Sequence, residues 1–167
     1  MPPGRRRALG LHFVPEERLG RGAVPTLSLA QNTLLTRTEA VSGSGWIRVD
    51  DVQRLAEELI ARYKVKAGGA GAAAKSLSGG NLQKFIVGRE IEAKPKLLIV
   101  SQPTWGVDAA AAASIRQSIL DRAGEGAAVV VISQDLDELL EVSDSFAVLN
   151  EGRLTKPRPT EGLTMDE

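Results

Sequence analysis

The sequence predicts an α/β fold, in which the strands of a parallel sheet are joined by helical crossovers. Two observations lead to this prediction. From Ser78 onward, segments with helical spacing alternate with short apolar runs, and this order is typical of a parallel sheet. The apolar runs 97–100 and 127–132 contain no alternating polar residues, which indicates strands buried on both faces.

The length and composition indicate one globular domain. The chain has 167 residues, of which 43% are hydrophobic and 25% are charged, values close to the average of globular proteins. Lys plus Arg and Asp plus Glu each total 21, so the chain lacks the basic surplus of nucleic-acid-binding proteins. It has no cysteine and a single histidine, His12, which excludes disulfides, thiolate zinc sites and histidine-rich metal centres. No apolar run is long enough to cross a membrane, so we expect a soluble, cytosolic protein. From the balance of basic and acidic residues we expect that it binds no nucleic acid.

Residues 1–48 form the least regular part of the chain, because prolines and glycines interrupt each short apolar stretch. Within it we expect a strand over 9–14 and a short helix over 27–35. The pattern becomes clearer behind Asp50, a good N-cap, where apolar residues recur at helical spacing. We therefore expect an amphipathic helix over 51–63.

The elements of the second half follow from capping residues, chain breakers and apolar runs. Ser78 and Asp108 are good N-caps, whereas Pro95 and Gly124 end the helices that follow them. In chain order we expect a helix to about residue 93, a strand over 97–100, a helix over 109–123, a strand over 127–132, a helix over 135–142 with Leu136, Leu139 and Leu140 facing inward, a strand over 146–149 and a loose tail from residue 156.

The stretch that says most about function runs Leu77-Ser78-Gly79-Gly80-Asn81-Leu82-Gln83-Lys84. A hydroxyl and two glycines at a helix start leave backbone N–H groups open, and the helix dipole adds partial positive charge, so a phosphate could dock there. The same residues also suit an ordinary serine N-cap. The context favours the phosphate, because polar residues follow both of the next two strands, in the stretches 101–108 and 133–138.

This order and spacing resemble the ATP-binding-cassette (ABC) ATPases. By this resemblance, residues 78–83 correspond to the signature motif, 97–102 to the Walker B strand and 106–108 to the D-loop, and Gln134 stands at the switch-histidine position. The residues of the signature, together with those of 14–18 and 133–138, are most similar to the second cassette of fused double-cassette ATPases that energise simple-sugar or nucleoside uptake.

The resemblance implies a partial P-loop NTPase fold with a helical signature subdomain. It divides the chain into an irregular segment after the Q-loop (1–48), the helical signature subdomain (49–94), the C-terminal α/β core of the cassette (95–154) and a flexible tail (155–167).

The resemblance also implies a nucleotide site shared between two cassettes. The nucleotide-binding residues would be Ser78, Gly79, Gly80, Gln83 and Asp108. The first three would close over the γ-phosphate of an ATP held by the phosphate loop of a partner cassette. The full transporter would use ATP and Mg²⁺ and would include permease subunits, with the cassettes lying on the cytoplasmic face of the cell membrane.

Three departures from the family pattern indicate that the chain's own hydrolytic site is degenerate. Ser101 and Gln102 stand where the family has an Asp that holds magnesium and a Glu that polarises the attacking water. A hydroxyl is a weak magnesium ligand, and a neutral amide cannot accept a proton. Gln134 replaces the imidazole of the switch histidine. We therefore expect no intact catalytic residue and no metal site, and an isolated chain without cofactor or ATPase activity.

The stretch 69–76 comes within one residue of a phosphate loop, with Ala74 in place of the last glycine. We reject it, because a working loop follows a buried strand and opens a helix, whereas this stretch continues from the Gly- and Ala-rich segment 66–74, which we expect to be a flexible linker, and runs into the residues of 77–84. The chain therefore resembles the C-terminal part of a cassette. The alternative is an interaction module, or a truncated product, that binds no nucleotide. A stand-alone ATPase is disfavoured by the missing phosphate loop.

Two single residues complete the expectations. His12 is expected to be a strand residue and not a catalytic base. Trp105, in the loop after the strand 97–100, is expected to anchor that loop by packing, with a contact in a cassette dimer as the functional alternative.

Overall fold

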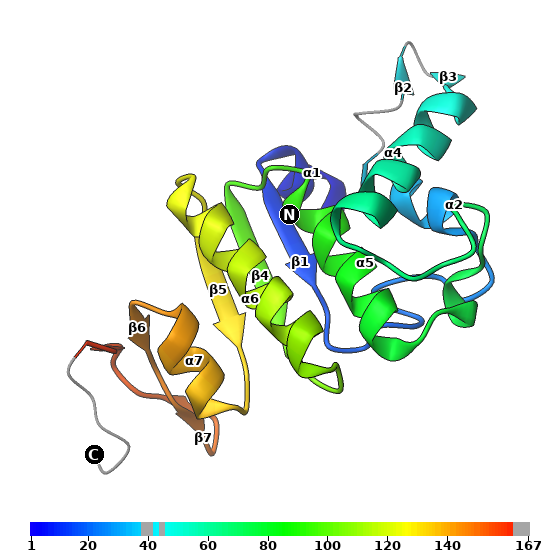
Figure 1. Cartoon of the computed structure of the whole chain (residues 1–167). Coiled ribbons are helices and arrows are strands. Elements are labelled where there is room, and N and C mark those ends of the chain that lie inside the picture. The colour runs from blue at the N-terminus through cyan, green and yellow to red at the C-terminus, as the bar shows by residue number, and fades with distance from the viewer. Residues whose placement is uncertain (38–41, 44–45, 162–167) are drawn as a thin grey trace.

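The computed structural model describes residues 1–37, 42–43 and 46–161, and a three-stranded parallel sheet lies at its centre (Figure 1). The sheet contains β1 (Leu11–Val14), β4 (Leu97–Ser101) and β5 (Ala128–Ile132) in the order β1-β4-β5. Helix α5 (Gly79–Ile91) precedes β4, and helix α6 (Ala109–Gly124) joins β4 to β5. The predicted α/β fold with a parallel sheet is therefore confirmed.

The remaining elements complete the described part of the chain. They are α1 (Pro3–Ala8), α2 (Leu29–Leu34), β2 (Ser42–Gly43), β3 (Trp46–Ile47), α4 (Val49–Arg62), the 3-10 helix η1 (Ala74–Ser76), α7 (Leu136–Val142), β6 (Ser145–Phe146), β7 (Leu149–Asn150), β8 (Arg153–Leu154) and β9 (Arg158–Pro159). Among the described residues, no helix has the length and apolar character needed to span a bilayer.

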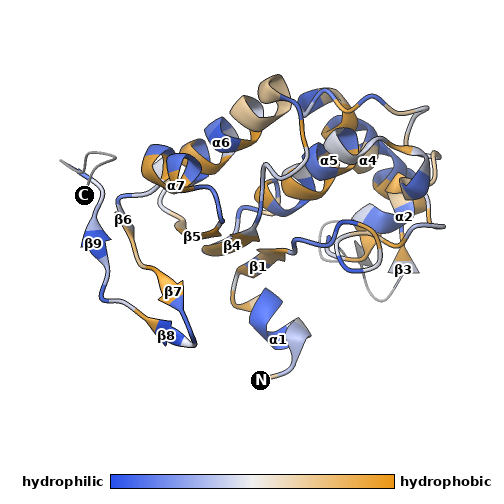
Figure 2. Cartoon of the chain, turned by 90° about the horizontal axis from the view of Figure 1, so that it is seen from below, coloured by the Kyte–Doolittle hydropathy of each residue, from blue (hydrophilic) through white to orange (hydrophobic). Residues whose placement is uncertain are grey.

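The two faces of the sheet differ in how they are covered. Successive strand residues point to opposite faces, and on one face Val14, Leu98 and Val100 are buried in a core that includes residues of α5 and α6. Figure 2 shows these two helices on one side of the apolar strands. On the other face, Phe13 is 47% exposed and Val130 is also 47% exposed. The expectation that 127–132 is buried on both faces is therefore wrong, because the described helices cover only one face of β5.

Helix α4 begins two residues earlier than the sequence predicts. Its N-cap is Arg48, so Asp50 and Asp51 lie in its first turn, where a carboxylate interacts favourably with the helix dipole. Asp51 also pairs with Arg48 at 2.7 Å and with Arg54 at 2.5 Å. The prediction of Asp50 as the cap is therefore wrong, although the helix itself is confirmed.

The segment 66–74 is packed and is not a flexible linker. Ala70 and Ala74 are fully buried, and the backbone bonds to α2 and the residues before it, with Leu29 N donating to Ala72 O at 2.9 Å and Ala74 N donating to Leu27 O at 3.0 Å. The small side chains let two backbones approach closely, so the same composition that indicated flexibility permits tight packing. The element directly before the stretch 69–76 is helix α4 and not a strand, and the stretch itself ends in η1, which agrees with its rejection as a phosphate loop.

The chain after β5 ends in two small antiparallel pairs. β6 pairs with β9, and β7 pairs with β8. The expected continuous strand over 146–149 is wrong, because its two ends belong to β6 and β7, which pair with different partners.

Helix α7 and the tail also differ from expectation. Leu136 is half exposed, whereas Glu138 is buried and accepts a hydrogen bond from Thr104 Oγ1 at 2.6 Å. Leu136 therefore does not face inward. The tail is hydrogen-bonded to the preceding part of the chain as far as Thr160, whose hydroxyl donates to the Ser143 carbonyl. The rest of the expected loose tail, 162–167, lies outside the described residues.

Candidate functional site

The N-terminal turn of α5 leaves polar groups available to a ligand. Ser78 occupies the N-cap, but its hydroxyl makes no capping bond and instead accepts a hydrogen bond from Asn81 Nδ2 at 2.8 Å. The helical bond to the Ser78 carbonyl is donated by Leu82 N, so the N–H groups of Gly79 and Gly80 have no partner within the helix. Because the helix dipole places partial positive charge at the same end, this turn suits an anion.

Gln83 holds this end of α5 against the loops after β1 and β4. Its side chain is fully buried. Its Nε2 donates to the Pro103 carbonyl at 2.9 Å, and its Oε1 accepts from Arg18 Nε at 3.1 Å. Because both polar ends of the amide are used inside the chain, the nucleotide contact expected of Gln83 does not fit this position.

The loop after β4 lies beside the turn. Asp108 caps α6 as predicted, accepting a hydrogen bond from Ala111 N at 2.8 Å. A Cβ placed on Gly80 would lie 3.7 Å from Val107 Cβ, and one placed on Gly79 would lie 4.0 Å from the Gly106 carbonyl oxygen. Residues 78–80 and 106–108 therefore form one continuous surface, which we call the turn–loop surface.

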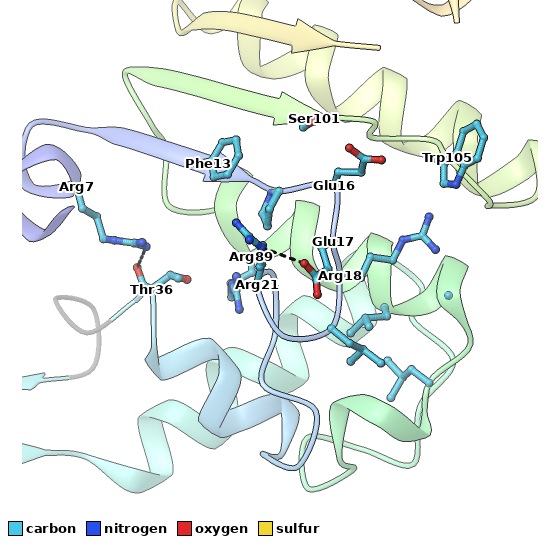
Figure 3. Close-up of a pocket in the computed structure, with 15 residues that line it drawn as sticks. Arg7, Phe13, Glu16, Glu17, Arg18, Arg21, Thr36, Arg89, Ser101 and Trp105 are labelled. Atoms are coloured by element: carbon cyan, nitrogen blue, oxygen red, sulfur yellow. Dashed lines mark hydrogen bonds and ion pairs between the residues drawn. The ribbon is translucent and has the colours of Figure 1, made fainter. Parts of the chain in front are cut away.

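A hollow of about 1200 Å³ opens next to the turn–loop surface (Figure 3). Its lining brings Gly79 together with Ser101 at the end of β4. Gln102 is buried, has a φ of 50° and is not part of the lining. Gln134 is exposed in the loop after β5 and does not line the hollow either. Of the three positions predicted to be degenerate, Ser101 is the one that faces this hollow.

Trp105 stands on the rim of the same hollow, together with Arg18 (Figure 3). Its side chain is 65% exposed. The expectation that it anchors the loop by packing is therefore wrong, and its contact in a cassette dimer stays a prediction.

A buried group of charges connects β1 to α5 behind the hollow. His12 is buried in β1, as expected of a strand residue, and its Nδ1 lies 2.7 Å from Glu90 Oε2. Arg89 Nε donates to Glu90 Oε1 at 2.7 Å. Burial by itself would raise the pKa of Glu90, but the hydrogen bond with His12 and the charge of Arg89 outweigh it, so the pKa is lowered from its ordinary value. This group links the sheet to the helix that carries the turn.

No family model matches the chain, but curated relatives do. The ribose import ATP-binding protein RbsA of Halalkalibacterium halodurans is 38% identical over 152 residues, which are 91% of this chain and 30% of that protein. The nucleoside import ATP-binding protein NupA of Lactococcus lactis is 41% identical over 143 residues, which are 84% of this chain and 28% of that protein. This chain is homologous to a segment of the ATP-binding proteins of ABC importers. It spans less than a third of the length of either relative.

The solved structures that it matches are cassettes of the same fold. A dimeric post-hydrolysis state of an ATP-binding cassette bound to ADP and Pi superposes with a TM-score of 0.79 at 19% identity, covering 98% of this chain and 69% of that one. A metal-chelate type ABC transporter in an inward-facing conformation superposes with a TM-score of 0.73 at 20% identity, covering 94% and 62%. These likenesses show the P-loop NTPase fold predicted from the sequence.

The residues present do not fit a magnesium ion held by this chain alone. Ser101 offers a hydroxyl where a hard cation prefers carboxylate oxygens, and Gln102 is buried. Throughout 1–37, 42–43 and 46–161, no group of three or more His, Asp or Glu residues is placed to hold a metal.

Arg18 also belongs to this region, although no sequence motif assigns it a role. It lies in the loop after β1, and its guanidinium reaches Gln83 and the glycines of the turn–loop surface. The signal that could have found it is its place just beyond the carboxyl end of β1, because parallel strands bring their carboxyl ends to one edge of the sheet.

Proposed function

We propose that this chain is the C-terminal part of a degenerate importer cassette, which supplies its signature motif in trans to ATP bound by a partner cassette. The observation that carries the proposal is the turn–loop surface, where Ser78 and the open N–H groups of Gly79 and Gly80 adjoin the loop that ends at Asp108. The relatives are named import ATP-binding proteins, and a matched cassette is dimeric, which supports a partner cassette as the source of nucleotide.

The chemistry of the turn suits a phosphate in particular. Two backbone N–H groups, the Ser78 hydroxyl, which can still donate its hydrogen, and the positive end of α5 converge on one surface, and such groups bind the oxygens of a phosphate without a metal. Their hydrogen bonds to an ionised oxygen are shorter and stronger than neutral ones. The chain's own residues thus orient and neutralise a phosphate and transfer no proton.

The chain's own hydrolytic position is inactive in this proposal. Ser101 faces the hollow with a neutral hydroxyl, and neither Gln102 nor Gln134 can accept a proton from water. In the full transporter, ATP and Mg²⁺ would be held by the partner cassette, and this chain would close the site from the opposite side.

The uncovered face of the sheet suits a role inside a larger assembly. Ile132 is 50% exposed and Phe13 47% exposed, and a polypeptide that carries a phosphate loop would cover these side chains. The further partners would be permease subunits, with the assembly on the cytoplasmic face of the cell membrane.

The experiment that tests the proposal is Ser78→Arg in the assembled transporter. The bulky cation would fill the turn–loop surface, and we expect ATPase activity to fall by more than about tenfold, which corresponds to about 1.4 kcal/mol of lost transition-state stabilisation. Ser114→Arg, on an exposed position of α6, is the matched control and should leave the activity unchanged. Equal activity of both variants would overturn the proposal and favour an interaction module that binds no nucleotide.

A further inference from the structure

We propose that Arg18 is a further phosphate-contacting residue of the turn–loop surface, with its guanidinium reaching the terminal phosphate of the nucleotide that a partner cassette holds. The inference rests on the proposed function, which gives this surface its ligand. It assigns a role to the loop after β1, for which the motifs of the sequence specify none.

The position of the guanidinium is set by a buried partner. Arg18 Nε donates to Gln83 Oε1 at 3.1 Å, and Gln83 is itself fixed by its bond to Pro103. From there Nη1 lies 2.8 Å from where a Cβ of Gly79 would be, and Nη2 lies 3.6 Å from where a Cβ of Gly106 would be. The outer edge of the guanidinium therefore lies over both parts of the turn–loop surface, on the rim of the hollow in Figure 3.

The charge of Arg18 has no counter-charge in the described part of the chain. No carboxylate there forms an ion pair with it, and its two terminal nitrogens have no hydrogen-bond acceptor there; Nε bonds to Gln83. Burial lowers the pKa of its guanidinium, as expected of a cation that loses water without gaining an anion. An arginine fork matches the geometry of phosphate oxygens. An anion placed over the turn would supply what this side chain lacks.

The other arginines of the hollow are already engaged. The lining contains four arginines, and the three besides Arg18 have acidic partners: Arg7 and Arg89 pair with Glu90, and Arg21 pairs with Glu17. Arg18 is therefore the arginine of the lining that has no acidic partner among the described residues. Its place beside the N–H groups of Gly79 and Gly80 allows one phosphate to contact all three.

The experiment uses the ¹⁵N-labelled chain and inorganic tripolyphosphate as the probe. In the wild type we expect the amide signals of Gly79 and Gly80 to shift with a dissociation constant in the millimolar range. Arg18→Ala should weaken this constant by about tenfold or more, because it removes a charge-assisted contact, and Arg18→Lys should give an intermediate value. Arg21→Ala, in the same loop but exposed and paired with Glu17, should bind as the wild type does.

A second variant and a second anion keep the test decisive. Should Arg18→Ala fail to fold, Arg18→Gln removes the charge while keeping a donor for Gln83, and the same weakening is expected. If the wild type shows the shifts and Arg18→Ala or Arg18→Gln binds tripolyphosphate with the same dissociation constant, the role of Arg18 is overturned and the proposed function stays in place. Absence of wild-type shifts at Gly79 and Gly80 would remove the phosphate site itself, and with it both proposals. Equal shifts with sulfate would show a general anion site and overturn the assignment to a triphosphate.

Discussion

Replacing Gly88 with Ala tests how closely α5 is seated on α4. Gly88 is buried in α5, and the ring of Tyr63, at the C-cap of α4, lies across it. A Cβ on Gly88 would lie 2.5 Å from Tyr63 Cδ2, 2.6 Å from Cγ and 2.7 Å from Cε2. These contacts are too short to persist, so the ring must move. Its far end is held by a hydrogen bond from Tyr63 Oη to Glu92 Oε1 at 2.9 Å.

Two opposing terms set the size of the effect. Ala in place of Gly in a helix interior stabilises by about 1 kcal/mol, whereas overpacking a core costs about 1–3 kcal/mol. Because the ring of Tyr63 is fixed at its hydroxyl, we expect the upper end of that range and a net loss of about 2 kcal/mol. For a chain of this length such a loss lowers Tm by about 4–8 °C.

The assay is thermal unfolding of Gly88→Ala, of Tyr63→Ala and of the double variant. Without the ring, Gly88→Ala should be neutral or stabilising, so the two substitutions should show a clear coupling energy. An unchanged or higher Tm of the Gly88→Ala variant alone, or a coupling near zero, would refute the reasoning, since either result means that the ring yields freely.

Three further predictions concern other residues. Gly79→Ala should leave Tm within a few degrees, because its Cβ would meet only the flexible tip of Arg18 at 2.8 Å; a chain that fails to fold in a melting curve would contradict this. Glu90→Gln should lower stability at neutral pH and flatten its loss in acid, measured by urea unfolding against pH. The pKa of Glu90 is lowered by folding, so its carboxylate contributes stability that is present above the ordinary value of 4.5 and is lost as the pH falls through the folded pKa; unchanged acid unfolding would argue against the buried charge group. The purified chain should neither bind ATP tightly nor hydrolyse it, and magnesium-dependent turnover that is abolished by Gln102→Ala would show the opposite.

The elements with strong local signals could be predicted from the sequence. The strands β1 and β4, helix α5 behind Ser78 and helix α6 behind Asp108 lie where apolar runs and caps placed them. The burial of β5 could not be predicted in the same way. An apolar run shows that a strand can be buried, but it does not show which neighbouring elements cover its two faces. The packed segment 66–74 was missed for a related reason, since small residues serve flexible linkers and close backbone contacts equally well.

In the candidate site, too, some features follow from local sequence and others do not. The turn at Ser78 and the cap at Asp108 follow from residues adjacent in sequence, and the structure brings them onto one surface. The inward position of Gln83 and the placement of Arg18 over Gly79 depend on contacts between residues more than sixty positions apart. No local pattern encodes such contacts, so they emerge only from the fold.

The left-handed backbone of Gln102, with φ at 50°, makes the end of β4 a strained corner. A side chain other than glycine pays about 1–2 kcal/mol for this conformation, and the corner persists because the backbone holds it from both sides: Gln102 N donates to the Ile132 carbonyl at 2.7 Å, and Trp105 N donates to the Gln102 carbonyl at 3.3 Å. The path from β4 to Asp108 is thus fixed by main-chain bonds. Side chains at 101 and 102 can change their chemistry without redirecting this path, so the turn–loop surface keeps its shape whichever polar groups these two positions carry.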